Sequence, residues 1–193
     1  MSKSLVFARP DASHLRAMLE IHCDPRTNAH NPFGPPTPAT ALALFEGWLE
    51  QWDREGFGYW AVCSSATSLE VLGFGGIMRK HIGSRFGLNL YFRISPLVWG
   101  QGLASAIAQE ALSQAFIGRC EPEVLALVRP ANTISRRTLE RAGLGVIDTT
   151  DDVPGQEPSL IYRISREDFQ HKYDANHSSD LPHSSAQILR VRR

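Results

Sequence analysis

Cysteine is scarce in this sequence, and its few cysteines show no pairing pattern. The chain of 193 residues holds three, Cys23, Cys63 and Cys120, which are far apart and lack CxxC spacing. An odd number of widely spaced cysteines is typical of free thiols in a reducing compartment, and not of a disulfide scaffold or a zinc site. We therefore expect a cytoplasmic protein that binds no metal.

Long hydrophobic runs and an excess of charge are also absent. The stretch MSKSLVFARPDASHLR lacks an apolar run long enough for a signal peptide, and no later stretch approaches the length of a membrane span. Lys plus Arg and Asp plus Glu number 20 each, so no basic field attracts nucleic acid or an anionic membrane. We expect neither as a partner, and the 42% of hydrophobic residues is typical of a globular domain.

The hydrophobic patterning predicts one domain over residues 1–170 and a polar tail over 171–193, with the terminal ILRVRR a candidate docked element. Strands are expected at 4–9, 58–64, 70–80, 85–95, 123–130, 143–152 and 159–165. Helices are expected at 11–23, 39–56, 101–116 and 132–142, the first capped by Asp11 and the others closed by Gly56, Gly118 and Gly143. The order combines antiparallel strands with a βαβ unit, whose right-handed crossover requires a parallel pair. The predicted fold class is α/β with a mixed sheet.

The segment DPRTNAHNPFGPPTP (24–38) contains five prolines and a glycine, which exclude a regular element there. Loops of this kind often cover functional sites, so we expect it to shape a ligand pocket together with residues 148–158. In the helix that follows, Leu44, Trp48 and Trp52 recur at helical spacing, and we expect them in the core.

The hexapeptide WGQGLA (99–104) joins a strand to an alanine-rich helix through a turn that nearly lacks side chains. The first amides of a helix are unpaired and carry a partial positive charge, so a turn without bulk lets a phosphate approach them closely. The alternative is a tight turn in which glycine serves only for its backbone freedom. The hexapeptide is not a Walker loop, because no Lys-Ser or Lys-Thr follows, and it lacks the GxGxxG dinucleotide fingerprint.

In its context the turn resembles the acyl-coenzyme A binding segment of the GNAT acetyltransferase superfamily. RISPLVWGQGLASAIAQEAL is similar to the branch of ribosomal-protein N-terminal acetyltransferases of the RimJ/RimL type, in which strand, Pro and two residues precede W-G-x-G-[YLI]-[AG]. A second block, N-x-x-S-x-[RK]-x-[LM]-E-[KR]-x-G-F, is matched from Asn132 to Gly143, with Leu144 in place of Phe. The resemblance covers about residues 4 to 170. It implies a GNAT-like fold in which the parallel strands at 85–95 and 123–130 splay apart.

The resemblance also implies acetyl-coenzyme A (acetyl-CoA) as co-substrate. The pyrophosphate would meet the backbone of the turn, formed by Trp99, Gly100, Gln101, Gly102, Leu103 and Ala104. The pantetheine arm would pair with the strand end at Phe92, Arg93 and Ile94, whose amides can hold the thioester carbonyl, while Asn132 would touch the arm from the other side. Arg136 and Arg137 are candidates for the 3′-phosphate, although arginines on a helix surface usually reach only water.

Ser135 is the catalytic acid that the resemblance implies, as donor of a proton or a hydrogen bond to the departing thiolate. Its hydroxyl is a weak acid, so it can donate a hydrogen bond to the sulfur more easily than it can transfer a proton. The structural alternative is that Asn132 caps the helix and Ser135 is an exposed first-turn residue.

The group that accepts the proton of the amine is not identified by the resemblance. Relatives often carry Glu where this chain has Asn89 and again where it has Ala106, and Asn cannot accept a proton at neutral pH. Each of four residues lies near a segment expected on the acceptor side, and none is favoured over the others: His22, His30, His81 and Glu157. A base acting through water, or an acceptor of low pKa, is also open.

Strand alternation places the residues at 89, 91 and 93 on one face of their strand and those at 90, 92 and 94 on the other. The second set is apolar and suits the face that packs under helices. The first set, Asn89, Tyr91 and Arg93, is then expected to bind the acceptor. We hypothesise that Arg93 binds an acidic group of the acceptor; the alternative is a solvated arginine.

An N-acetyltransferase that moves the acetyl group of acetyl-CoA to a primary amine by direct attack is the leading interpretation. The acceptor is a protein N-terminus or a small molecule such as an amino acid, a polyamine or an antibiotic amine. The missing glutamate leaves open a CoA-binding regulatory module without turnover. The oligomeric state is open as well, with a homodimer as one alternative.

Overall fold

A computed structural model describes residues 5–64 and 70–177 of the chain. Its strands form one seven-stranded sheet with the order β1-β2-β3-β4-β5-β7-β6. The strands are β1 (Leu5–Ala8), β2 (Tyr59–Ser64), β3 (Val71–Ile82), β4 (Arg85–Ile94), β5 (Glu123–Val128), β6 (Gly145–Thr150) and β7 (Ser159–Ser165). All neighbours pair antiparallel except β4 and β5, which are parallel, so the predicted mixed sheet is confirmed.

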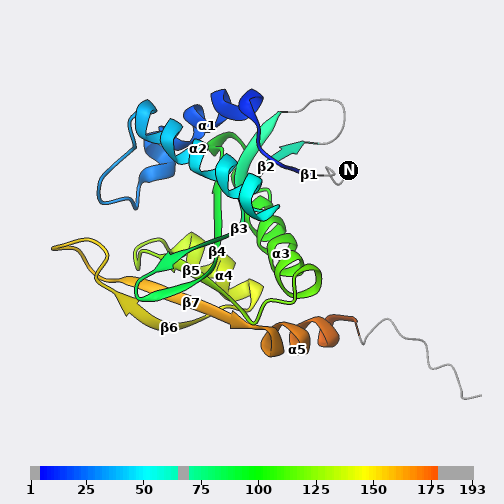
Figure 1. Cartoon of the computed structure of the whole chain (residues 1–193). Coiled ribbons are helices and arrows are strands. Elements are labelled where there is room, and N and C mark those ends of the chain that lie inside the picture. The colour runs from blue at the N-terminus through cyan, green and yellow to red at the C-terminus, as the bar shows by residue number, and fades with distance from the viewer. Residues whose placement is uncertain (1–4, 65–69, 178–193) are drawn as a thin grey trace, which may run out of the picture.

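Five α-helices accompany the sheet within the described residues. They are α1 (Leu15–His22), α2 (Pro38–Glu55), α3 (Leu103–Ser113), α4 (Thr133–Ala142) and α5 (Arg166–His177). Figure 1 shows α1 and α2 toward the β1–β2 end of the sheet and α5 beyond β7 at the other end. In these residues no helix combines the length and the hydropathy that a membrane crossing requires.

The helix ends follow local capping chemistry. Asp11 accepts a hydrogen bond from the Ser13 amide at the start of a short 3-10 turn that leads into α1. Gly56 and Gly143 close α2 and α4 in the left-handed conformation, with φ of 70° and 106°. The predicted roles of these three caps are confirmed.

Apolar side chains pack on both faces of the sheet. On one face Leu90, Phe92 and Ile94 of β4 join a cluster that contains Ile107 and other residues of α3. On the opposite face a second cluster brings together α1, α2 and the sheet, through Met18, Phe45, Trp48, Tyr59 and Phe74. The alternation predicted for β4 is therefore confirmed, but both faces lie under helices.

The parallel pair β4–β5 is joined at one residue pair only, Asn89 with Leu125. On its other side β4 pairs with β3 along its whole length, from Arg85 opposite Ile82 to Ile94 opposite Gly73. The edge of β4 that faces β5 is therefore unpaired beyond Asn89, where the sheet opens. The expected splay of the parallel strands is confirmed.

Three local expectations need comment. Leu44 is 45% exposed, so its prediction as a core residue is wrong, whereas Trp48 is buried. The proline-rich segment contains one short 3-10 turn, Pro25–Asn28, because Asp24 caps it and Pro25 starts it. Helix α5 crosses the boundary placed between residues 170 and 171; the connection at 65–69 and ILRVRR lie outside the described residues, so the division into domain and tail stays a prediction.

We expect Gly75→Ala to destabilise the fold, because β3 approaches β4 and α3 closely at this position. The new methyl group would lie 2.6 Å from the Tyr91 carbonyl oxygen and 2.7 Å from Ile107 Cγ2. Urea unfolding should show a loss of about 1–3 kcal/mol. The matched control is Gly47→Ala in α2, where a Cβ meets nothing within 4 Å. It should be neutral or stabilising by up to about 1 kcal/mol, and equal stability of Gly75→Ala and the parent would contradict the close approach.

Candidate active site

The turn before α3 is an open cradle of backbone amides. Gly100 and Gly102 have φ of 76° and 78°, a conformation that L side chains rarely adopt, and a Cβ at either position would meet nothing within 4 Å. No side chain caps α3, and within residues 5–64 and 70–177 the amides from Gly102 to Ser105 donate to no protein acceptor. Four unpaired amides around open space fit a phosphate or pyrophosphate group.

The cradle is fastened to the end of β4. The indole of Trp99 donates from Nε1 to the Ile94 carbonyl oxygen at 2.9 Å, while half of the side chain stays exposed. The Ser95 amide donates to the Leu72 carbonyl oxygen, also at 2.9 Å, and continues the contact with β3. The cradle and the open edge of β4 are thus held as one unit.

At the splay, a ligand would contact the main chain of Phe92, Arg93 and Ile94 and not their side chains. Phe92 and Ile94 direct their side chains into the core cluster under α3. The Arg93 side chain lies on the opposite face. The predicted contact of these three residues with pantetheine therefore concerns main-chain groups alone, and it stays a prediction.

Helix α4 begins beside this region. Asn132 caps it, because its Oδ1 accepts from the Ser135 amide at 3.1 Å. The half-buried Ser135 hydroxyl makes no recorded hydrogen bond inside the described part of the chain, so it can serve a ligand. Arg137 is exposed, whereas the Arg136 guanidinium donates to Tyr162 Oη and to the Pro130 carbonyl oxygen, both at 3.1 Å. Of the two arginines, Arg137 is the one free to reach a phosphate.

A cavity of about 260 Å³ lies on the other face of β4, under α1 and α2. Its walls combine apolar and aromatic side chains with a few polar groups. They are His22, Asn28, Asn31, Pro36, Leu44, Trp48, Tyr59, Met78, Lys80, Tyr91 and Arg93. Tyr91 and Arg93 therefore line a cavity, and Leu44 lines it as well. That this cavity receives the acceptor stays a prediction.

His22 is buried at the wall of this cavity and is held by two contacts. Its Nδ1 lies 3.1 Å from the Met18 carbonyl oxygen and its Nε2 lies 3.0 Å from Tyr91 Oη. A carbonyl oxygen only accepts, so we assign the proton to Nδ1, and Tyr91 donates its hydroxyl hydrogen to Nε2. Burial, with a further contribution from Arg93, lowers the pKa of His22 to about 3.

Arg93 ties β4 to the proline-rich segment. Its Nη1 donates to Asn28 Oδ1 at 2.8 Å and reaches the His22 carbonyl oxygen at 3.4 Å. Asn28 is buried and donates back to the same carbonyl oxygen at 2.7 Å. The alternative of a solvated, outward Arg93 is thus wrong, because the side chain is held at the cavity wall.

Asn89 is buried and takes part in the core instead of the cavity wall. Its Nδ2 donates to Tyr59 Oη at 2.6 Å, and it is absent from the lining of the cavity. Burial raises the pKa of Tyr59, so this phenol stays neutral. Asn89 shares the acceptor-side face with Tyr91 and Arg93 but supports Tyr59, which lines the cavity in its place.

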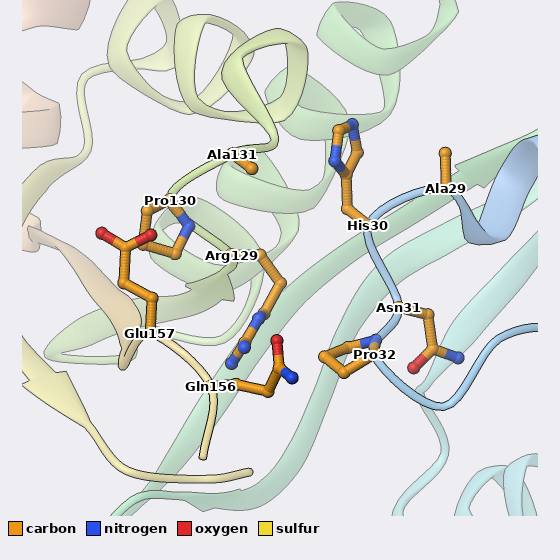
Figure 2. A pocket seen from close by; sticks show the side chains of 9 residues that line it. All are labelled: Ala29, His30, Asn31, Pro32, Arg129, Pro130, Ala131, Gln156 and Glu157. Carbon is orange, nitrogen blue, oxygen red and sulfur yellow. The ribbon is translucent and has the colours of Figure 1, made fainter. Parts of the chain in front are cut away.

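A second cavity of about 230 Å³ lies between the proline-rich segment and the connections that follow β5 and β6 (Figure 2). One wall is the segment Ala29–Pro32, and the other is formed by Arg129–Ala131 after β5 with Gln156 and Glu157. Figure 2 shows the Arg129 side chain between the two walls. Arg129 is fixed there, because its Nη1 donates to Asp152 Oδ1 at 3.0 Å and to Ser159 Oγ at 2.9 Å. Asn31 lines both cavities, so both border the proline-rich segment.

The four candidate bases separate in space. His22 lines the first cavity, and His30 and Glu157 line the second. His81 packs against Phe86 near the β3–β4 turn, with ring centroids 4.9 Å apart, and lines neither cavity. In the part of the chain that the structure describes, no three His, Cys, Asp or Glu residues come together in a way that could hold a metal ion.

Sequence reasoning missed Lys80 and Asn28 as cavity residues. The place of Lys80 can be worked out from strand pairing. Met78 opposes Asn89 and Lys80 opposes Gly87, so these two β3 side chains lie on the same face of the sheet as Tyr91. This reasoning requires the register of the β3–β4 pair, which cannot be read from the sequence. Asn28 lies in an irregular segment and contacts a residue 65 positions away, for which no local pattern exists.

Comparison with known proteins bears on the whole architecture. An acetyltransferase of the GNAT family from Bacillus anthracis has a similar structure, with TM-score 0.69 and 19% identity over 86% of this chain and 98% of that one. A GNAT superfamily phosphinothricin acetyltransferase from Sinorhizobium meliloti, in complex with AcCoA, gives TM-score 0.61 and 18% identity over 86% and 89%. At these identities the likeness concerns the fold.

The sequence itself is similar to a named enzyme and matches a family model. The FsC-acetyl coenzyme A-N(2)-transacetylase of Aspergillus fumigatus is 28% identical over 137 residues, which are 68% of this chain. The match spans about half of that relative, 54% of its length. Residues 4–145 match the acetyltransferase (GNAT) domain. With the fold and the amide cradle, this match shows that the chain belongs to the GNAT acetyltransferase family, whose co-substrate is acetyl-CoA.

Proposed function

We propose that this protein is an N-acetyltransferase that moves the acetyl group of acetyl-CoA to a primary amine by direct attack. The observation that carries the proposal is the unpaired amide cradle of Gly102–Ser105, fastened by Trp99 to the open edge of β4. The Aspergillus fumigatus relative, named for acetyl coenzyme A and an N(2) position, supports transfer to nitrogen.

The chain supplies three contacts to the acyl donor under this proposal. The cradle amides bind the pyrophosphate, and the main chain of Phe92–Ile94 pairs with the pantetheine arm. An amide of the same strand holds the carbonyl oxygen as negative charge develops during attack. The new C–N bond forms as the C–S bond breaks; the amine loses a proton, and the thiolate gains one from, or is hydrogen-bonded by, the Ser135 hydroxyl.

The acceptor nitrogen must be neutral to attack. For an alkyl amine of pKa about 10 the neutral form at pH 7 costs about 4 kcal/mol, and for an α-amine of pKa about 8 only about 1.4 kcal/mol. His22 is a weak base, because an imidazolium there would be buried beside Arg93. We assign His22 the role of orienting Tyr91, whose oxygen can then accept a hydrogen bond from the acceptor. Proton removal through water to His30 or Glu157 fits their place in the adjoining cavity.

The finer assignment to the RimJ/RimL type, with a peptide N-terminus as acceptor in the cytoplasm, rests on the motif resemblance. Both cavities border the proline-rich segment, which agrees with an acceptor that enters between this segment and the β6–β7 connection. An α-amine has a lower pKa than an alkyl amine, so it would also need a base less.

One observation favours a second function, a CoA-binding module without turnover. The position that, by the motif resemblance, often holds glutamate is Asn89 here, and its amide donates to Tyr59. Thiol release from acetyl-CoA, measured against a mixed panel of free amines and N-terminal peptides, decides between the two. Amine-dependent release of CoA with an N-acetylated product supports the enzyme. CoA binding without release for any acceptor supports the module.

We expect Gly102→Glu to abolish the increase in Tm that CoA gives the parent, because its carboxylate would stand where the pyrophosphate binds. Thermal unfolding with and without CoA measures this. The control is Gly56→Ala, which has a similar positive φ and open surroundings far from the cradle. It should lower Tm through backbone strain but keep the CoA-dependent shift. A normal shift in folded Gly102→Glu would make the turn purely structural.

Ser135→Ala and Asn132→Ala should have separable effects. The Ser135 hydroxyl has no recorded protein partner in the described part of the chain, so its loss should lower kcat and leave stability and CoA affinity unchanged. Asn132→Ala removes the cap of α4 and should cost about 0.5–2 kcal/mol in unfolding free energy, with weaker CoA binding. Steady-state kinetics and urea unfolding measure both variants. Parental kcat in Ser135→Ala would remove this residue from catalysis.

Acid should weaken the fold through His22. The neutral ring is favoured in the fold, so its stabilisation is complete above pH 6.5 and is lost as the pH falls toward about 3. Between these values the single group adds a slope of up to about 1.4 kcal/mol per pH unit to the free energy of unfolding. His22→Gln should flatten the curve by that amount, whereas His81→Gln, at an exposed histidine, should not. Parallel curves for His22→Gln and the parent would contradict a buried neutral His22.

A further inference from the structure

The charged side chains that line the cavity under α1 and α2 all have the same sign. Two of its lining side chains are basic, Arg93 and Lys80, and none of its described lining residues is Asp or Glu. Neither basic residue has an ion-pair partner among the described residues. Cations at the wall of an otherwise apolar and aromatic cavity favour an anionic ligand and oppose a cationic one.

The two cations hold different places along the cavity. Arg93 opposes Phe74 in the β3–β4 pair and stands next to Phe92 and Ile94, where the splay begins to open. Lys80 opposes Gly87, six residues from position 93 along the same strand direction. At about 3.4 Å per residue this places their Cα atoms roughly 20 Å apart, so they are separate contact points. Arg93 is the near contact and Lys80 marks the far end.

The Arg93 guanidinium is already held in place before a ligand binds, which suits it to bind an oxyanion. Its Nη1 is held by Asn28, so the guanidinium loses little further freedom when a ligand arrives. A planar guanidinium fixed in this way matches a carboxylate. Lys80 is exposed at the mouth of the cavity and has no hydrogen-bond partner among the described residues, and desolvation by its neighbours lowers the pKa of its ammonium group.

We propose that the cavity selects amine acceptors that carry an acidic group near the amine, which Arg93 binds, and that Lys80 rejects acceptors with a second ammonium group. Polyamines are excluded by this charge pattern, while amino acids and peptides whose N-terminal residues are acidic share the chemistry it accepts. The inference rests on the proposed acetyl transfer and specifies its substrate class. The apolar lining, with Leu44, Trp48 and Met78, suits an apolar body on the acceptor.

Matched acceptors test the selection. Phenylalanine is compared with phenethylamine, an alanyl-aspartyl peptide with its alanyl-asparaginyl counterpart, and both sets with 1,5-diaminopentane. Thiol release gives kcat/KM, and calorimetric titration of each acceptor into the enzyme with CoA gives binding that is independent of turnover. We expect the acidic member of at least one pair to be favoured about tenfold to hundredfold. The pair that responds identifies a free amino acid or a peptide as the source.

Three variants assign the effect to residues. Arg93→Gln should erase the preference by raising KM for the acidic acceptor, with KM for acetyl-CoA unchanged. Lys80→Glu should improve binding of 1,5-diaminopentane and weaken binding of the acidic acceptor, whereas Lys80→Arg should match the parent. Because Arg93 also holds the proline-rich segment, Asn28→Ala serves as its control. It releases the same tether but keeps the guanidinium, so it should reduce the preference only in part, whereas Arg93→Gln should erase it.

The outcomes separate this inference from the proposed function. Transfer or binding that favours the neutral amine or the diamine in the parent overturns the inference and leaves acetyl transfer standing. An unchanged preference in both Arg93→Gln and Lys80→Glu overturns it as well. If no acceptor yields thiol release, the proposed turnover fails, and the calorimetric preference in the CoA complex still decides the selectivity of the cavity.

Discussion

The parting of β4 from β5 is the constraint on which the site depends. The two strands pair at Asn89 and Leu125 and nowhere else, so beyond that point the edge of β4 that faces β5 lacks a partner strand. Unpaired backbone within a fold is costly unless water or a ligand satisfies it. Here β3 secures the opposite edge of β4 over its full length, so β4 stays in the sheet while its other edge is free.

Because side chains alternate along β4, the two faces of this strand have different roles. Leu90, Phe92 and Ile94 pack under α3, which fixes the helix whose first amides form the cradle. Tyr91 and Arg93 face the opposite way, into the cavity under α1 and α2. The proposed donor and acceptor sites therefore share one strand without competing for the same side chains. The glycines of β3, Gly75 above all, make this arrangement compact because they let β4 and α3 approach closely.

Elements with strong local signals could be predicted from sequence. The alanine-rich α3 with its glycine turn, the caps at Asp11 and Gly143, and the alternation of β4 all depend on neighbours within a few positions. Leu44 failed because helical spacing does not say which turn of a helix overhangs a cavity. The hydrogen bonds of Arg93 with Asn28 and of Tyr91 with His22 join residues 65 and 69 positions apart. The first contact arises from packing of the irregular proline-rich segment and the second from packing of α1 on β4, so no local sequence pattern predicts either.

Hydrogen–deuterium exchange with and without CoA tests most directly whether the open edge of β4 and the turn before α3 hold the donor. CoA should slow exchange in peptides that cover residues 90–95 and 100–106, because unpaired amides gain acceptors there. Peptides from β1 and β6 should exchange as before. Unchanged exchange at 90–95 and 100–106 under saturating CoA, or protection confined to another part of the sheet, would contradict the assignment of this region as the acetyl-CoA site.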